Sequence, residues 1–143
     1  IFSKLEQGEI KTKQGIFYDG QIFDAYCFVS DLIKGAKAKI ILIDNYIDET
    51  VLSLFSKCNK SIEITIYTKN ISQKEKLDIS KYNQQYRPIT IKEFNKSHDR
   101  FLIIDSTVYH FGASLKDLGK KWFAFAKMEI KASEILDRLK DSK

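Results

Sequence analysis

The sequence predicts an α/β domain in which helices cover both faces of a mixed, largely parallel sheet. In the first half of the chain, strand-like and helix-like segments alternate, which is the pattern of parallel βαβ units. In the second half, strand-like segments follow one another, so the sheet is expected to be mixed. The chain has 143 residues, of which 43% are hydrophobic and 30% are charged. This is the size and composition of one globular domain, not of a disordered or collagen-like chain.

The predicted domain covers residues 15–143. Residues 1–14 are interpreted as the end of a helix, or a linker, from a missing N-terminal domain, because they are polar and helix-prone and Gly8 interrupts them. The chain does not begin with Met and lacks the apolar core of a signal peptide, so we interpret it as a fragment of a longer protein. No apolar run approaches the ~20 residues that a transmembrane helix needs.

The first elements are predicted from apolar spacing. Residues 15–20 suit a short strand and a turn. Residues 22–36 carry apolar side chains at helical spacing, and Gly35 lies near the end of that helix. Residues 39–43 are rich in apolar, β-branched side chains, which predicts a buried strand, and residues 49–57 return to helical spacing.

The middle of the chain continues this alternation. Residues 61–67 place isoleucines at every second position, which predicts a strand with one buried face. Residues 73–85 are polar and predict a helix, and residues 89–94 alternate again as a strand.

The last elements lie close together in the sequence. Residues 100–105 and 107–111 predict two paired strands, and residues 114–121 predict a short helix. Residues 123–128 predict a further strand, and residues 132–139 an amphipathic helix that closes the domain.

Charge and cysteine content narrow the choice of partner and compartment. The net charge of +5 favours phosphate-bearing partners, either nucleic acid or an anionic membrane. Both signs are spread along the chain, so an ordinary mixed-charge surface remains an open alternative. Cys27 and Cys58 lie far apart and form no CxxC motif, which favours a reduced, cytoplasmic protein.

The most informative segment begins at His98 and ends near Gly112. Side chains alternate along a strand, so His98 and Arg100 are expected to point the same way. A guanidinium binds phosphate oxygens through two parallel hydrogen bonds, and an imidazole attacks phosphorus or moves a proton near neutral pH. Asp105 is a candidate for orienting the histidine, and Gly112 for letting the backbone approach a phosphate. The alternative is a polar start to a buried strand followed by an ordinary turn at Asp105 and Ser106.

This segment resembles the signature of the phospholipase D superfamily: His-x-Lys, four residues, Asp, six residues, then Gly-Ser-x-Asn. His98, Asp105 and Gly112 match it in type and spacing. Asp44 and Tyr46 resemble the Asp-x-Tyr element that follows an earlier strand of the family. The order of elements also agrees over residues 15–139, so the resemblance implies a phospholipase D-like fold.

The chain departs from this signature at three positions. Arg100 stands in place of the Lys, Ala113 in place of the Ser and Leu115 in place of the Asn. Ser114 is a candidate substitute for the missing hydroxyl, although strand alternation would point it elsewhere. The same segment also resembles the phospholipase D-like domain of MIT-domain proteins, a non-catalytic and membrane-binding version of the fold.

The stretch from His98 to Phe125 more closely resembles the C-terminal domain of bacterial prophage and mobile-element DNA-binding proteins, whose N-terminal domain is KilA-like. This resemblance implies a role in DNA transactions in the cytoplasm and makes an anionic membrane the less favoured partner. This resemblance does not state the reaction; the phospholipase D resemblance implies a metal-independent phosphodiesterase or nuclease that requires neither metal nor cofactor. Because the family uses two histidines and this chain has one such motif, catalysis would require a homodimer.

Within that enzyme hypothesis, His98 is the nucleophile, Arg100 the phosphate anchor and Asp105 the support for the histidine. Gly112 and Ser114 would shape the phosphate pocket. The alternatives are a non-catalytic anion clamp and a dimerisation module for the absent DNA-binding domain.

Further candidates surround this motif. Lys116, Lys120 and Lys121 lie beside Trp122, a pattern that grips a phosphate backbone and stacks bases, although a solvated helix end has the same pattern. Asp44 and Tyr46 are candidates for lining the cleft, and Phe123 and Phe125 are expected in the core. A metal site joining His110 to His98 and Asp99 is a weak alternative, since the spacing is not that of a metal motif.

Overall fold

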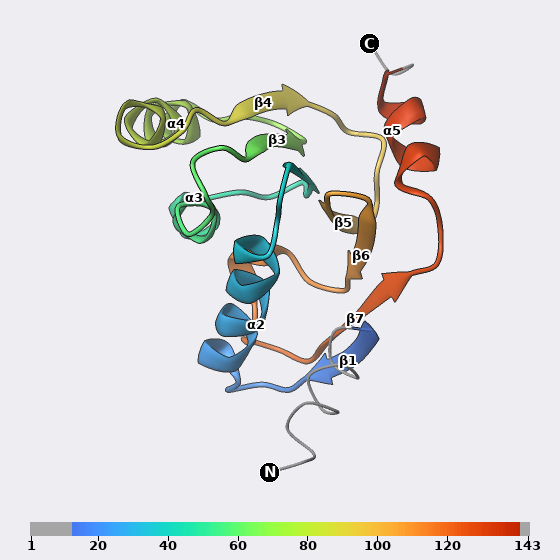
Figure 1. Ribbon diagram of the computed structural model, residues 1–143. Helices are drawn as coiled ribbons and strands as arrows, with labels where there is room; N and C mark the ends of the chain where they lie inside the picture. Colours follow the sequence, from blue (N-terminus) through green and yellow to red (C-terminus); the bar gives the residue numbers. More distant parts are fainter. Residues whose placement is uncertain (1–12, 141–143) are drawn as a thin grey trace.

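The structure is a computed structural model that describes residues 13–140, so the predicted helix end or linker at the N-terminus lies almost entirely outside it. The described residues form a seven-stranded mixed sheet in the order β1-β7-β6-β5-β2-β3-β4 (Figure 1). The strands are β1 (Gln14–Phe17), β2 (Lys39–Ile43), β3 (Glu63–Thr68), β4 (Thr90–Glu93), β5 (Arg100–Ile104), β6 (Thr107–Phe111) and β7 (Phe123–Met128).

The prediction that this sheet is largely parallel is wrong. Only β2 with β3 and β3 with β4 run parallel. The other four pairs, which join β2 to β5, β5 to β6, β6 to β7 and β7 to β1, are antiparallel. After β4 the chain crosses to the far side of β2 and adds its remaining strands there, where short connections produce antiparallel neighbours.

Helices cover both faces of the sheet, as predicted. Helices α2 (Ile22–Lys34), α3 (Glu49–Phe55) and α4 (Gln73–Gln85) lie on one side, and α5 (Ala132–Lys140) lies on the other (Figure 1). The predicted short helix after β6 is a single 3-10 turn, η1 (Leu115–Asp117).

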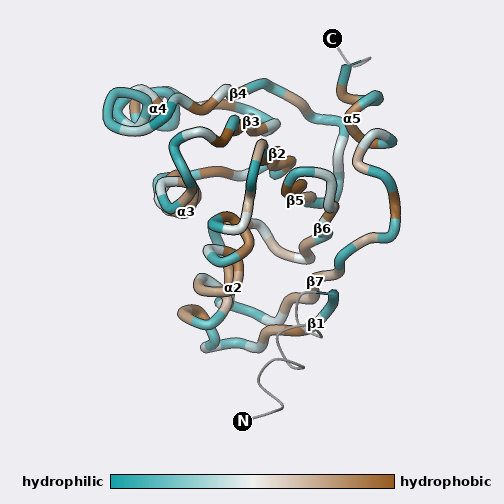
Figure 2. Tube along the Cα trace, in the orientation of Figure 1, coloured by the Kyte–Doolittle hydropathy of each residue, from teal (hydrophilic) through white to brown (hydrophobic). Residues whose placement is uncertain are grey.

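The central strand β2 explains why the core has two layers. Ile40 and Leu42 face the large cluster under α2, α3 and α4, whereas Ile41 and Ile43 face the smaller cluster under α5. Both sets are buried, so β2 is apolar along almost its whole length, as Figure 2 shows in brown. Such burial on both faces is what the unbroken run of apolar side chains predicted.

Local capping fixes the connections that lead to the site. Asp48 caps the start of α3 by accepting hydrogen bonds from the amides of Thr50 and Val51. Because β2 ends at Ile43, only a short connection separates that strand from its cap. The side chains of this connection are therefore held close to the edge of the sheet.

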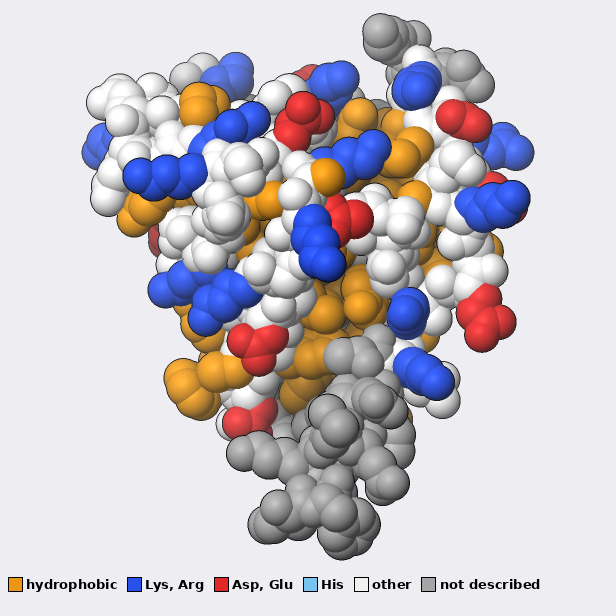
Figure 3. Space-filling view, in the orientation of Figure 1, with side chains coloured by type: hydrophobic (Ala, Val, Ile, Leu, Met, Phe, Trp, Pro, Cys, Tyr) orange, Lys and Arg blue, Asp and Glu red, His pale blue; other side chains and the backbone are white. Residues whose placement is uncertain are grey.

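Within residues 13–140, none of the helices combines the length and apolar character needed to cross a bilayer. Basic and acidic side chains are interspersed over the face drawn in Figure 3 rather than gathered into one basic patch. On that face, attraction for a phosphate backbone therefore depends on local arrangement more than on total charge.

Candidate functional site

A pocket of about 480 Å³ opens at the edge of the sheet where β2 ends and β5 begins. The antiparallel pairing of these strands brings their two ends together, since Ile43 lies opposite Phe101. The chain then returns along β6, and the loop from β6 to β7 forms the opposite wall. The lining residues are Tyr46, Arg100, Gly112, Ala113, Ser114, Asp117, Lys120, Lys121 and Trp122.

Arg100 is the first residue of β5 and is fixed by the neighbouring strand. It lies opposite Phe111, and its Nη2 donates a hydrogen bond to the Gly112 carbonyl oxygen at 2.7 Å. Its Nε is buried and has no hydrogen-bond partner among the residues that the structure describes. The guanidinium lines the pocket and is held in place by Gly112, so its remaining donors are suited to a phosphate oxygen.

Gly112 contributes by its lack of a side chain. Its amide donates to the Ala124 carbonyl at 2.8 Å, and an added Cβ would lie 3.2 Å from that oxygen. The glycine therefore lets β7 approach closely while its own carbonyl holds Arg100. It lines the pocket, and the close approach in this structure is to β7; its contact with a phosphate stays a prediction.

Asp44 does not line this pocket; it is fully buried behind Ser114, which does. Its carboxylate accepts hydrogen bonds from the Ser114 hydroxyl at 2.9 Å and from the amides of Leu115 and Tyr46 at 2.9 and 3.1 Å. Burial raises the pKa of Asp44 above its ordinary value, while these donors and the charge of Arg100 oppose the rise. The cluster ties the end of β2 to the start of η1.

Ser114 therefore lines the pocket and hydrogen-bonds to Asp44, contrary to the expectation from strand alternation. The strand ends at Phe111, so alternation no longer applies three residues later. Leu115, which occupies the position of the family's Asn, is buried in the core instead. The structure thus places a hydroxyl in the site one position later than the signature does.

His98 does not lie in the pocket with Arg100. The two residues before β5 form a bend, so the strand alternation that would align the two side chains begins only at Arg100. The imidazole is exposed and has no hydrogen-bond partner among residues 13–140. The preceding residue is anchored, since the Asn45 amide donates to the Ser97 carbonyl at 3.0 Å. His98 therefore sits two residues from the pocket and faces solvent.

Asp105 lies at the other end of β5, so it is not placed to orient His98. Its carboxylate accepts hydrogen bonds from the amides of Lys37, Ala38 and Lys39 at 2.8–3.1 Å. Burial raises the pKa of Asp105, but these amides outweigh that effect and lower it overall. Its φ of 56° is tolerated by aspartate in a tight turn. The residue is therefore structural and stabilises the β5–β6 turn.

The basic residues of the β6–β7 loop are partly neutralised by Asp117. Its carboxylate contacts the amines of Lys116 at 3.0 Å and Lys120 at 3.3 Å. Burial raises the pKa of Asp117, but the two lysines outweigh it and lower the pKa. Lys121 lines the pocket and forms no ion pair within the described part of the chain.

Lys116 also contacts Tyr46. Its amine is 6.0 Å from the centre of the Tyr46 ring. Both residues line a smaller neighbouring cavity of about 420 Å³, which shares Tyr46 with the Arg100 pocket. Tyr46 is 54% exposed and borders both cavities. Of the two predicted cleft residues, Tyr46 thus lines the cavities, whereas Asp44 is buried and lines neither.

Trp122 forms the opposite rim and is 67% exposed. Its Nε1 donates to Asp19 at 2.8 Å, and its ring meets Tyr18 edge to face at 4.7 Å. An exposed indole held by two contacts offers a flat surface for stacking. By contrast, Phe123 and Phe125 are buried, as expected.

His110 points to the α5 face, opposite to Arg100. It pairs with Phe101 across the strands, and its Nε2 lies 3.2 Å from the Asp99 carboxylate. The structure therefore joins two members of the weak metal alternative. Across residues 13–140, however, no three His, Cys, Asp or Glu side chains form a group suited to a metal ion.

Known proteins resemble this chain in structure rather than in sequence. No model of a known protein family matches the sequence, and no curated protein matches it. The chain is similar to NucT from Helicobacter pylori, with a TM-score of 0.61 and 14% identity over 90% of this chain and 91% of NucT.

Two longer proteins also contain this fold. Phosphatidylserine synthase from Haemophilus influenzae matches with a TM-score of 0.57 and 15% identity over 91% of this chain. TrmBL2, an archaeal chromatin protein described with a novel mode of DNA binding, matches with a TM-score of 0.55 and 14% identity over 97% of this chain. The chain spans 35% and 57% of their respective lengths.

NucT and phosphatidylserine synthase share the phospholipase D-like fold, which the sequence motif predicted for this chain. Similarity over nine-tenths of the chain includes the mixed sheet and the helices on its two faces. The chain therefore has the phospholipase D-like fold.

Proposed function

We propose that this domain binds the phosphodiester backbone of DNA in the pocket around Arg100. The observation that supports this most directly is the Arg100 guanidinium, which lines the pocket and is already oriented by its hydrogen bond to the Gly112 carbonyl oxygen. Charged donors held in place before binding are well suited to phosphate oxygens. Structural neighbours that include a nuclease and a DNA-binding protein are consistent with this assignment.

The rest of the pocket supports an extended anionic ligand. Lys121 and Lys120 provide positive charge on one wall, although Asp117 engages Lys120. Tyr46 and Trp122 form aromatic rims on either side, where bases or sugars adjacent to the bound phosphate would lie. The pocket therefore has the charge and the aromatic surfaces that suit a nucleic acid. As part of the same proposal, the chain is related to DNA-binding proteins of mobile elements.

Binding is tested by titrating the protein with duplex and single-stranded DNA at several salt concentrations. Trp122 is the only tryptophan in the chain and lines the pocket, so its fluorescence reports binding directly. We expect Arg100→Ala to weaken binding at least tenfold and to reduce the salt slope by about 1, because one phosphate contact is lost.

Lys81→Ala is the matched control, since it removes one positive charge from exposed α4, away from the pocket. It should leave affinity nearly unchanged. Equal losses in the two variants would mean that total charge, rather than the pocket, governs binding, and the proposal would then fail.

A second candidate function is metal-independent cleavage of DNA by a homodimer, with His98 as nucleophile. The observation in its favour is that the His98 imidazole is exposed and unpartnered within the described residues, two positions from Arg100. In this reaction the imidazole attacks phosphorus and one P–O bond of the diester breaks. A second copy of His98 protonates the departing oxygen, and water then hydrolyses the phosphohistidine.

Cleavage is tested in EDTA with DNA and a small chromogenic diester. The wild type is expected to cleave, and His98→Ala is expected to lose turnover while keeping DNA affinity. If neither protein cleaves at concentrations where a dimer is confirmed, the domain is an anion clamp or a dimerisation module. Retention of DNA binding would distinguish the clamp from the module.

A further inference from the structure

A second pocket, of about 470 Å³, lies between α3, β3 and the end of α4. It is enclosed by the carboxyl ends of two helices and by the first half of β3, where Ile64 forms its floor. The Arg100 pocket lies where β2 ends, at the other end of this parallel pair of strands. The two pockets share no lining residue.

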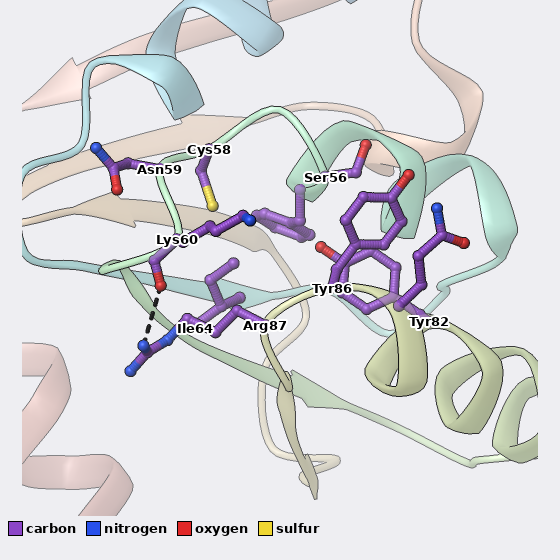
Figure 4. A pocket seen from close by; sticks show the side chains of 10 residues that line it. Ser56, Cys58, Asn59, Lys60, Ile64, Tyr82, Tyr86 and Arg87 are labelled. Carbon is purple, nitrogen blue, oxygen red and sulfur yellow. Dashed lines mark hydrogen bonds between the residues drawn. The ribbon is translucent and has the colours of Figure 1, made fainter.

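One wall of this second pocket is aromatic. The rings of Tyr82 and Tyr86 lie side by side, with centres 4.9 Å apart and planes inclined at 33° (Figure 4). Tyr82 is buried against the core, whereas 42% of Tyr86 is exposed. Tyr86 therefore presents a ring that is supported from behind and open on its other side, which is a suitable surface for a flat ligand.

The opposite side is cationic. Lys60 and Arg87 both line the pocket, and no Asp or Glu lines it. Neither cation forms an ion pair with a carboxylate among the residues that the structure describes. The Arg87 guanidinium is held at the mouth by a 3.0 Å hydrogen bond to the Lys60 carbonyl oxygen (Figure 4). The remaining donors of this guanidinium are suited to an anionic group.

Two of the titratable neutral groups that line the pocket, Cys58 and Tyr82, leave this positive charge intact. Burial raises the pKa of the Cys58 thiol above its ordinary value, and it raises the pKa of the Tyr82 hydroxyl to about 12. Both groups are therefore protonated at neutral pH. The pocket then carries the charges of its two cations without a compensating anion.

The loops that form the mouth are anchored. Asn59 accepts hydrogen bonds from the amide and hydroxyl of Ser61, which fixes the turn that carries Lys60. Asn83 receives the Ile89 amide at 2.9 Å, which ties the segment after α4 back to the helix. Both cations thus project from fixed turns, and little ordering is needed for a ligand to bind.

We propose that this second pocket binds a free mononucleotide, with the base stacked on Tyr86 and the phosphate held by Lys60 and Arg87. The volume suits one nucleotide rather than a strand, and the pocket lies within the usual range for small-molecule sites. The ligand is identified by its two required features, an aromatic plane and an anionic group. This proposal is independent of the function assigned to the Arg100 pocket.

The test is calorimetric titration of the full chain with AMP as the probe. Wild type should bind AMP saturably, whereas adenosine and inorganic phosphate, which each provide one feature, should bind at least tenfold more weakly. Tyr86→Ala should weaken AMP binding roughly five- to hundredfold, the range for loss of a stacking surface, and Tyr86→Phe should restore it. Lys60→Gln should weaken binding about two- to fivefold.

Two controls locate the ligand. Lys57→Gln removes an exposed lysine near the pocket that does not line it, and it should bind AMP as the wild type does. Arg100→Ala should also bind AMP normally while losing DNA affinity. The proposal is overturned if wild type shows no saturable binding, if Tyr86→Ala binds normally, or if Arg100→Ala loses AMP. Because DNA binding is measured on the same variants, failure of one site is distinguishable from failure of the other.

Discussion

At the scale of single residues, the Arg100 pocket depends on a carboxylate that no ligand is expected to touch. Asp44 is fully buried, and the Ser114 hydroxyl lies within 3.0 Å of both of its carboxylate oxygens and 3.1 Å from the Tyr46 carbonyl oxygen, so its single proton is donated within this cluster. One serine thus joins the end of β2 to the loop that forms the opposite wall. Loss of that hydroxyl would leave a buried carboxylate short of a donor.

We therefore expect Ser114→Ala to lower the free energy of unfolding by about 1–3 kcal/mol at neutral pH. Burial raises the pKa of Asp44, so the folded chain holds this proton more tightly than the unfolded chain. The stability gained from this tighter proton binding is complete below pH 3.8, the ordinary pKa of the carboxyl group. It is lost as pH rises through the raised pKa of Asp44. The charged carboxylate needs its donors most, so the effect of the substitution should be smaller in acid.

Denaturant unfolding at neutral and acidic pH measures this difference. Ser53→Ala, on the exposed side of α3, is the control and should change stability by less than about 0.5 kcal/mol. An effect of Ser114→Ala that is equal at both pH values would show that the hydroxyl does not support the charged form of Asp44.

Among these residues, the sequence predicted chemistry better than geometry. Arg100, Gly112 and Ser114 line one pocket, because each lies at a strand end or in the loop that follows. Asp105 does not line it, because it follows the last residue of β5, at the opposite end of the strand from Arg100. Spacing along a strand indicates which face a side chain lies on, but not which edge of the sheet it lies near. Asp117 was missed because its importance depends on two lysines that a loop folds onto it.

At the scale of elements, the β6–β7 loop is positioned by a close contact with the start of α2. Gly119 has a φ of +78°, and an added Cβ would lie 2.5 Å from the Ile22 Cα and 2.6 Å from the Gln21 carbonyl oxygen. The Gly20 amide also donates to the Gly119 carbonyl at 3.0 Å. This contact holds in place the segment that carries Lys120, Lys121 and Trp122.

Gly119→Ala should therefore displace the loop, lower stability by roughly 3 kcal/mol and weaken DNA binding severalfold. Gly20→Ala is the matched control, because Gly20 has a φ of +89° but nothing lies within 4 Å of an added Cβ. It should lower stability by about 1 kcal/mol, the cost of the backbone conformation alone, and should bind DNA normally. Thermal unfolding and Trp122 fluorescence titration measure both effects. Similar results for the two variants would exclude steric positioning of the loop by α2.

Most elements could be predicted from local spacing, but the direction of their pairing could not. β2, α4, β6 and β7 begin and end at the predicted residues, because apolar periodicity and caps are properties of neighbouring positions. The pairing of β2 with β5 joins segments about 60 residues apart. The periodicity of a strand does not indicate whether its neighbour runs parallel or antiparallel. The parallel pairing expected from the alternation of strands and helices in the first half was therefore wrongly applied to most of the sheet.

At the scale of the whole molecule, the two pockets lie at opposite ends of the same parallel strands. The Arg100 pocket lies where β2 ends, and the second pocket, which contains Tyr86, borders the first half of β3. This separation means that each can be altered without contact with the other. It also leaves the Arg100 edge available for a second copy of the chain, which the proposed cleavage reaction needs.

That requirement predicts how mixtures of wild type and His98→Ala behave when subunits exchange. If each reaction uses His98 from both copies, only dimers of two wild-type chains cleave. A mixture with half of its chains substituted should then show about one quarter of the full activity per total chain, because random pairing makes active dimers the square of the wild-type fraction. Cleavage of the chromogenic diester in EDTA, after incubation that permits exchange, measures this ratio.

Mixing wild type with Lys81→Ala in the same proportion should cause no loss, because that residue lies away from the pocket. A reduction to one half with His98→Ala would mean that each chain works alone. A second histidine would then have to come from the same chain, and His110 is the only other one in the sequence. Its position on the α5 face, against Asp99 and opposite to Arg100, makes the two-copy arrangement the more consistent one.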